Sequence, residues 1–196
     1  MAPERARPAG GPTDPVAAAA GPAAGATGPA ELDAERIYDA LRGQLRAALS
    51  ASARTPHLVG VHSGGAWIAE RLHADLALPT PLGYLSSAFH RDDYPARGLP
   101  ARPRPTRLDF DIAGADLIVV DDILFTGRTV RAALNELFDY GRPARVELAV
   151  LLDRGGRELP VAAQYVGAHR PLAAPEQFVL TQDTAGRLAL RIERDA

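Results

Sequence analysis

Two adjacent carboxylates stand just before a loop of small and hydroxylated residues in the stretch LIVVDDILFTGRT, residues 117–129. The loop runs from Thr126 to Thr129, and a helix that begins after it would offer unpaired backbone N–H groups and the positive end of its dipole. A phosphate can bind there without a cationic side chain. The carboxylates of Asp121 and Asp122 suit sugar hydroxyls, and can hold Mg²⁺ directly or through water. The spacing therefore indicates a ligand with a phosphate at one end and a hydroxylated ring beside it, such as a ribose 5-phosphate.

Alternating strand and helix patterns from residue 31 onward indicate the elements that must position this stretch. Apolar residues recur every fourth position over 33–51, which is typical of an amphipathic helix. Near-continuous apolar runs are typical of strands that are covered on both faces. Runs that alternate between apolar and polar residues are typical of half-buried strands. The elements predicted after the first helix are a strand at 57–62, a helix around 67–76, a strand within 81–90, a half-buried strand through Leu108, Phe110 and Ile112, a strand at 117–122, a helix from about Val130 that ends at a left-handed Gly141, and a strand at 146–153.

This order of elements predicts an α/β fold with a doubly wound, mainly parallel sheet and right-handed crossovers. Ligands of such sheets bind outside the carboxyl ends of the strands. Three polar stretches fall at that edge, namely 63–65, 121–122 and 153–154. The sequence therefore predicts that they form one site.

The composition excludes several kinds of chemistry. All 22 basic residues are arginine, so the chain has no lysine for a Schiff base or for a Walker-type phosphate site. It has no cysteine, which excludes disulfides and thiolate catalysis and favours a reducing cytoplasm. The formal net charge of −2 gives no overall attraction to nucleic acid or anionic membranes. Residues 1–30 are rich in Ala, Pro and Gly and are expected to form a disordered tail, which leaves 31–196 as the folded domain.

The stretch at 117–129 resembles the signature that binds 5-phosphoribosyl 1-pyrophosphate (PRPP) in type I phosphoribosyltransferases. FHRDDY at 89–94, YGRPARVELAVLLDRG at 140–155 and DRGGRELP at 153–160 are similar to the family of pyrimidine operon regulators that are also uracil phosphoribosyltransferases. The similarity runs from about Asp33 to the end of the chain. It implies a type I phosphoribosyltransferase fold with a small hood and a mobile loop, and the formation of UMP and pyrophosphate from uracil and PRPP.

The resemblance also implies a role for each part of the site. The acidic pair would hold the ribose 2′- and 3′-hydroxyls, and the loop would wrap the 5-phosphate. Arg91 would begin a segment that closes over the site, and would act in catalysis with Arg154 and the acidic pair. Magnesium would arrive with PRPP, with Asp122 as a further ligand. The implied site residues are Asp121, Asp122, Ile123, Leu124, Phe125, Thr126, Gly127, Arg128 and Thr129 for PRPP, Ser63, Gly64 and Gly65 for pyrophosphate, and Asp153, Arg154 and Gly155 for the base.

One loop departs from the family pattern. Family members usually carry Thr-Arg-Gly after the first strand, and that arginine contacts pyrophosphate, whereas this chain has Ser63-Gly64-Gly65. A missing bidentate arginine would remove support for a charged leaving group. The departure favours an alternative in which the protein senses PRPP or UMP and regulates pyrimidine genes with little catalysis. A transferase for a purine or for orotate is a further alternative, against which DRGGRELP argues.

The resemblance also implies RNA binding by the first helix and a base-binding role for Asp153, and each has a simpler interpretation. Arg36, Arg42 and Arg46 on the first helix are the candidates for binding pyrimidine-operon mRNA, although arginines on a helix flank are usually only a solvated face. Asp153 would belong to the base pocket, or would instead cap the end of its strand. The family also suggests a homodimer or a higher homo-oligomer.

Overall fold

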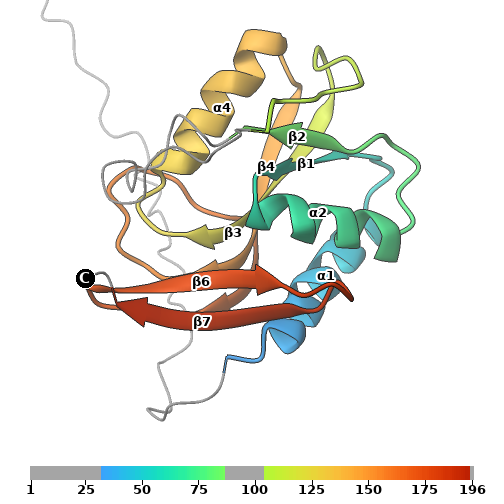
Figure 1. Ribbon diagram of the computed structural model, residues 1–196. Coiled ribbons are helices and arrows are strands. Elements are labelled where there is room, and N and C mark those ends of the chain that lie inside the picture. The colour runs from blue at the N-terminus through green and yellow to red at the C-terminus, as the bar shows by residue number, and fades with distance from the viewer. Residues whose placement is uncertain (1–31, 87–103, 195–196) are drawn as a thin grey trace, which may run out of the picture. The chain divides into compact units, whose positions relative to one another are not determined.

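A five-stranded parallel sheet forms the centre of the described part of the protein (Figure 1). The computed structural model describes residues 32–86 and 104–194, so the tail expected at 1–30 and the segment around Arg91 lie outside them. The strand order is β2-β1-β3-β4-β5, and every neighbouring pair is parallel. The strands are β1 (His57–Val61), β2 (Gly83–Leu85), β3 (Asp116–Leu124), β4 (Arg145–Asp153) and β5 (Tyr165–His169).

Successive residues of a strand point to opposite faces of the sheet, and helices cover both faces. On one face, α1 (Ala34–Ser50) and α2 (Gly64–Asp75) enclose the side chain of Ile118. On the other face, α4 (Arg128–Tyr140) covers its neighbour Val119. The doubly wound α/β sheet predicted from the sequence is therefore confirmed. Within the described ranges, no helix has the length and apolar character needed to span a membrane.

A separate antiparallel hairpin, β6 (Glu176–Gln182) and β7 (Leu188–Arg194), forms the small hood that the family resemblance implies. Figure 1 shows it beside α1, and the side chains of Phe178 and Leu180 join the core on that face of the sheet. The hairpin is held near the carboxyl ends of the central strands, where it bounds the cavity described below.

Most of the predicted elements are confirmed, with boundaries that differ by a few residues. The helix predicted at 33–51 is α1, whose start is capped by the side chain of Asp33 through a 3.1 Å hydrogen bond from the backbone N–H of Arg36. The strands predicted at 117–122 and 146–153 are β3 and β4. These elements follow from local periodicity, which the tertiary structure preserves.

Two predictions are wrong. The alternating residues Leu108, Phe110 and Ile112 form no strand. Their apolar side chains pack against the sheet instead. Phe110 stacks on the ring of His57 with centroids 3.8 Å apart, and Ile112 is buried. An isolated antiparallel bridge joins this region to β2, between Arg107 and Tyr84. Gly141 is extended (φ 165°) rather than left-handed, and its missing side chain leaves room for Ile112, whose Cβ would lie 3.2 Å from an added Cβ.

Glu35 fastens the hood to the sheet domain. Its carboxylate accepts two hydrogen bonds from the guanidinium of Arg71, at 2.8 and 2.6 Å, and a third at 2.8 Å from the backbone N–H of Leu188 in β7. Arg71 in turn lies over the ring of the fully buried Tyr38, 4.1 Å from its centroid. The hydrogen bonds from Arg71 are the main reason that the pKa of Glu35 lies below its usual value of 4.5.

We expect Glu35→Gln to lower the free energy of unfolding at pH 7 by about 1.5–3 kcal/mol, the usual range for hydrogen bonds to a charged group. Because the pKa of Glu35 is lower in the folded than in the unfolded state, its stabilisation is full above the ordinary pKa and is lost as the pH falls through the folded value. Denaturant unfolding between pH 7 and pH 3 should therefore show the parent and the variant converging at the acid end. Glu193→Gln, on the exposed part of β7, is the matched control and should change little at any pH. A difference that stayed constant with pH would contradict this role of the charge.

Candidate functional site

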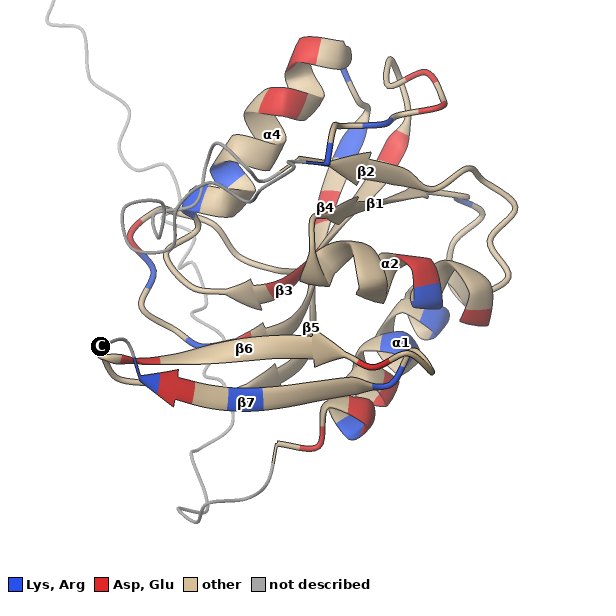
Figure 2. Ribbon diagram, in the orientation of Figure 1, with Lys and Arg blue, Asp and Glu red and all other residues tan. Residues whose placement is uncertain are grey.

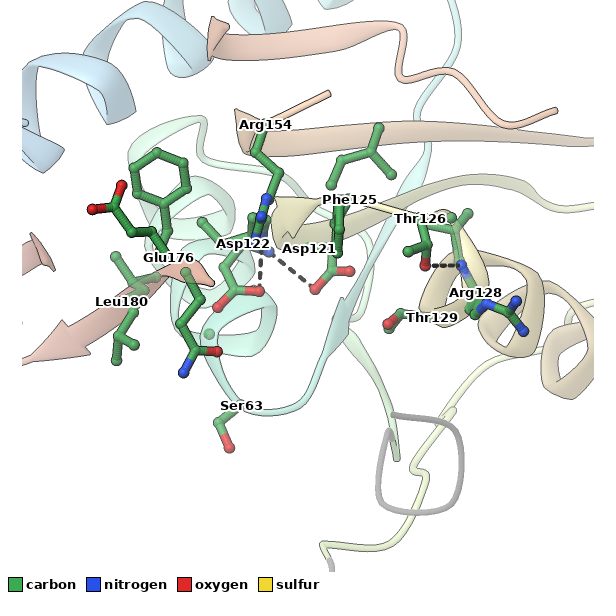
Figure 3. Close-up of a pocket in the computed structure, with 18 of the residues that line it drawn as sticks. Ser63, Asp121, Asp122, Phe125, Thr126, Arg128, Thr129, Arg154, Glu176 and Leu180 are labelled. Atoms are coloured by element: carbon green, nitrogen blue, oxygen red, sulfur yellow. Dashed lines mark hydrogen bonds between the residues drawn. The ribbon is translucent and has the colours of Figure 1, made fainter. Parts of the chain in front are cut away.

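A cavity of about 630 Å³ opens at the carboxyl ends of the central strands (Figure 3). The tip of β3, the starts of α2 and α4 and the strand β6 of the hood surround it. It is lined by Ser63, Gly64, Trp67, residues 121–130, Arg154, Glu158 and residues 174–180. The three loops that the sequence places at this edge thus each contribute to one cavity, although not with every residue that was expected.

The acidic pair lies within the last residues of β3. Asp121 is buried, with 4% of its surface exposed, and its Oδ1 accepts a 3.0 Å hydrogen bond from the backbone N–H of Asp122. Asp122 Oδ1 accepts a similar bond of 2.9 Å from the N–H of Ile123. Figure 3 shows both carboxylates at the strand tip, and both line the cavity. Each carboxylate is therefore held in place by the backbone, which prepares it to accept hydrogen bonds from a ligand.

The phosphate loop, defined here as residues 126–129, joins β3 to α4. Gly127 adopts a left-handed conformation (φ 90°), which favours glycine, and stands at the N-terminus of α4. Thr126 Oγ1 accepts a 3.2 Å hydrogen bond from the backbone N–H of Arg128, and Thr129 also lines the cavity (Figure 3). The positive end of the helix dipole therefore faces the cavity, as an anion-binding loop requires.

The side chain of Arg128 is directed to a carboxylate. Its Nε and Nη2 donate to Glu158 Oε2 at 2.9 and 2.7 Å, and both side chains are about half exposed, at 51%. The backbone of the phosphate loop, rather than this side chain, is thus the part best placed to bind a phosphate.

The glycine loop, residues 63–65, lies against the acidic pair. A Cβ atom added at Gly64 would overlap Asp122 Oδ2 and lie 2.6 Å from Asp122 Cγ. A Cβ at Gly65 would overlap the carbonyl oxygen of Val120 and lie 2.9 Å from the Cα of Asp121. The start of α2 can therefore approach β3 only because both residues lack side chains. An arginine at position 64, as in the family pattern, cannot be accommodated unless Asp122 moves.

Arg154 supplies a buried positive charge beside the carboxylates. It is 7% exposed, and its guanidinium lies over the ring of Phe125, 3.9 Å from the centroid. Its Nη2 donates to the carbonyl of Leu172 at 3.2 Å, and its backbone N–H donates to the carbonyl of Leu124 at 3.0 Å. These contacts fix the guanidinium near the tip of β3, on the wall of the cavity (Figure 3).

Three of the residues expected at the site, Gly65, Asp153 and Gly155, do not line the cavity. Asp153 Oδ1 accepts a 2.9 Å bond from the N–H of Gly155, and Oδ2 pairs with Arg157 at 2.5 Å. Gly65 also lies behind the cavity wall, and Arg91 is outside the described residues. These contacts match the alternative in which Asp153 caps its strand end, while its role toward a base stays a prediction.

The sequence patterns missed the hood's share of the cavity. Residues 174–180 form one wall, and Trp67 of α2 also lines the cavity. The alternation in FVLTQ at 178–182 was a usable signal for a strand, but nothing local indicates that this strand faces the tip of β3.

His62, which directly follows β1 and precedes the glycine loop, has a structural position. Its ring stacks on Tyr84 with centroids 5.4 Å apart, and its backbone N–H donates to the carbonyl of Leu85 at 3.0 Å. Burial lowers its pKa, and the positive charge of Arg104 lowers the pKa further. A neutral ring at this position braces β1 against β2.

A magnesium ion carried by a phosphorylated ligand fits the donor set of the cavity. Asp122 Oδ2 lies over Gly64 on the cavity wall and is the kind of oxygen ligand that Mg²⁺ prefers. In the part of the chain that the structure describes, there is no group of three or more His, Cys, Asp or Glu side chains arranged to hold a metal.

Comparison with known proteins identifies the family. Residues 31–178 match the family described as phosphoribosyl transferase domain. The chain belongs to the phosphoribosyltransferases. It is 51% identical to the bifunctional protein PyrR of Ralstonia nicotianae over 160 residues, and this match covers 81% of this chain and 91% of the relative. It is 46% identical over 156 residues to the bifunctional protein PyrR of Nitrosococcus oceani, covering 78% and 88%. Within the phosphoribosyltransferases, the chain therefore belongs to the PyrR family.

A solved structure agrees on the fold. The hypoxanthine phosphoribosyltransferase of Trypanosoma cruzi superimposes with a TM-score of 0.58 at 21% identity, covering 85% of this chain and 97% of that one. At this identity the likeness concerns the fold alone, and confirms the type I phosphoribosyltransferase fold expected from the sequence.

We expect Gly64→Ala to weaken PRPP binding by at least about tenfold, because displacing a binding group by an ångström is costly. The added methyl must push the Asp122 carboxylate from its place. Isothermal titration of PRPP in the presence of Mg²⁺ measures the loss. Gly43→Ala is the matched control, since a Cβ there meets nothing within 4 Å and should only favour α1. Equal PRPP affinities for the two variants would show that Asp122 does not need its present position.

Proposed function

We propose that this protein transfers the phosphoribosyl group of PRPP to uracil, forming UMP and pyrophosphate. The observation that carries the proposal is that the acidic pair and the phosphate loop line one cavity of about 630 Å³. A ribose whose hydroxyls contact the acidic pair can extend its 5-phosphate to the start of α4. In the transfer, the bond between ribose C1 and the pyrophosphate oxygen breaks, a bond from C1 to uracil N1 forms, and the N1 proton is released.

The residues of the cavity would act by positioning and by electrostatics. The backbone of the phosphate loop binds the 5-phosphate, and Asp121 and Asp122 accept hydrogen bonds from the ribose hydroxyls. The transition state resembles an oxocarbenium ion, so the negative charge of the acidic pair stabilises the ring while the site holds the reacting atoms in line. Mg²⁺, when bound with PRPP, supplies positive charge to the pyrophosphate. No covalent nucleophile is needed.

The leaving pyrophosphate would be bound without an arginine from the glycine loop. The first N–H groups of α2, which begins at Gly64, point out of the helix start and are the available donors. Ser63 lines the cavity and its side chain does not cap the helix, so its hydroxyl is a further donor. Arg154, buried beside the carboxylates, adds a positive charge, and Arg91 is expected to act from the segment that closes over the site.

The base side of the site is proposed to combine an apolar wall with backbone groups. Ala174 and Pro175, just before the hood, and Val179 in β6 line the cavity, and they suit the flat faces of a base. Uracil presents two carbonyls and an N–H at its edge, which backbone groups of the loop after β4 can read. A homodimer or higher oligomer remains the expectation from the family, as does a cytoplasmic location.

A regulatory activity is the second candidate, because relatives of this chain bear the name bifunctional. The expected partner is pyrimidine-operon mRNA, bound through α1. Arg42 of that helix pairs with Asp39 at 2.9 Å and Asp75 at 3.1 Å, and Arg46 donates to the carbonyl of Asp75 at 3.2 Å. Figure 2 shows acidic and basic residues interspersed along α1. These contacts favour a solvated helix flank over a basic surface at this place, so the regulatory candidate rests on the relatives' name and on the glycine loop.

The decisive assay is formation of UMP from labelled uracil, PRPP and Mg²⁺, with hypoxanthine and orotate in parallel reactions. We expect product from uracil and at least about a hundredfold less from the other bases, since a site built to hydrogen-bond one edge rejects a mismatched one strongly. Turnover of hypoxanthine or orotate instead would assign the enzyme to another base. Binding of PRPP and UMP without turnover of any base would identify a sensor.

Asp122→Asn is expected to reduce kcat/KM for PRPP by roughly ten- to a hundredfold, which corresponds to losing a charge-assisted hydrogen bond. The amide can still accept the bond from Ile123 N–H, so thermal unfolding should be almost unchanged. Asp139→Asn, exposed on α4, serves as the control for the loss of one negative charge. A variant at position 122 that bound PRPP and turned over like the parent would refute the role of the acidic pair.

A further inference from the structure

We infer that Arg157 is a positioning residue that ties the base side of the site to the phosphate side. It does not line the cavity, so it has no direct contact with a ligand there. Its effect would pass through the base-side loop, defined as residues 154–161, and through the end of β3. The inference rests on the proposed phosphoribosyl transfer, because it concerns how that site holds a base relative to a phosphate.

The guanidinium of Arg157 contacts the backbone immediately before the phosphate loop. Its Nη1 donates to the carbonyl of Leu124 at 3.1 Å and to the carbonyl of Phe125. These two residues connect the acidic pair to Thr126, where the phosphate loop begins. Leu124 and Phe125 line the cavity, and their carbonyls are held by Arg157, which does not line it.

The same guanidinium holds both ends of the base-side loop. Its Nη2 pairs with Asp153 Oδ2 at 2.5 Å, directly before the loop, and its Nε donates to the carbonyl of Val161 at 3.2 Å, the last residue of the loop. Nη1 also reaches the carbonyl of Gly155 at 3.3 Å. One planar group therefore joins three pieces of backbone and a carboxylate, an arrangement that the shorter set of donors on lysine cannot reproduce.

The base-side loop is also pressed against the phosphate loop by its own backbone. The N–H groups of Glu158 and Leu159 both donate to the carbonyl of Thr126, at 3.0 and 3.1 Å. Gly156 is left-handed (φ 73°), and a Cβ there would lie 2.5 Å from the ring of Phe125. The two loops therefore form one unit, with Arg157 among their contacts.

The ion pair between Arg128 and Glu158 also connects the two loops, but it is weaker than the contacts of Arg157. Arg128 and Glu158 form an ion pair whose side chains are 51% exposed, and such exposed pairs contribute little to stability. The side chain of Arg157 is 23% exposed and that of Asp153 is 17% exposed, so their bonds are less screened by water. Arg157 is therefore the side chain expected to set the distance between a bound base and a bound 5-phosphate.

The test compares ligands that differ only in the base. Ribose 5-phosphate probes the phosphate side, and UMP probes both sides. The dissociation constant of ribose 5-phosphate divided by that of UMP therefore measures the contribution of the base side without any catalysis. We expect Arg157→Met to lower this ratio by about tenfold or more, by analogy with the cost of misplacing a binding group. Its affinity for ribose 5-phosphate should stay within about threefold of the parent, because the phosphate loop remains at the start of α4.

Two further variants separate positioning from folding. Arg157→Lys keeps the charge and should recover only part of the ratio, and it replaces Arg157→Met if that variant does not fold. Arg145→Met, which removes an exposed arginine from the opposite end of β4, should leave the ratio unchanged. If Arg157→Met produced UMP, its kcat should fall together with a rise in the KM for uracil, while the KM for PRPP changes less.

The outcomes distinguish this inference from the proposed function. A ratio that falls in the Arg157 variants supports the inference even if the parent forms no UMP, in which case only the transfer activity is rejected. The role of Arg157 would be overturned if its variants lost affinity equally for both ligands, which leaves the ratio unchanged. It would also be overturned if the parent bound UMP and ribose 5-phosphate equally well.

Discussion

The parallel pairing of β3 with β4 determines where every part of the site lies. In this register Asp121 is opposite Val150 and Leu124 is opposite Asp153, so both strands end at the same level of the sheet. β1 pairs with β3 on its other side, also in parallel, and ends near the glycine loop. Because parallel strands point the same way, the loops that follow them meet at one edge. The base-side loop and the glycine loop are neighbours of the carboxylates and the phosphate loop for this reason, although they come from other parts of the sequence.

A negatively charged ligand must share this edge with two carboxylates, and the chain separates the charges by position. The carboxylates stay on β3, each anchored by the N–H of the next residue. The phosphate loop turns away at the left-handed Gly127, so the start of α4 offers its dipole and its unpaired N–H groups several residues farther on. Arg154, 7% exposed and stacked on Phe125, is a buried positive charge close to the strand tip. A ligand with a phosphate at one end and hydroxyls nearer its centre satisfies both parts of this arrangement.

The glycine loop illustrates how packing limits the chemistry of the site. α2 begins so close to β3 that Gly64 has no room for a side chain beside the Asp122 carboxylate. The missing arginine of the family pattern is therefore coupled to the position of the acidic pair, and is more than the loss of one cation. The loop itself offers an anion backbone N–H groups and the Ser63 hydroxyl, which agrees with a helix that starts at Gly64.

The sequence by itself determined the elements whose signals are local. The four-residue spacing of α1, the apolar runs of β3 and β4 and the Thr-Gly-x-Thr loop are read within a few residues, and the two periodicities of helix and strand suffice to assign them. Only the tertiary structure decided which surfaces meet. It placed the hood strand β6 across the cavity, packed Leu108 and Phe110 on the sheet without a strand, and set Gly64 against Asp122. These outcomes depend on contacts between residues tens of positions apart, which no local pattern encodes.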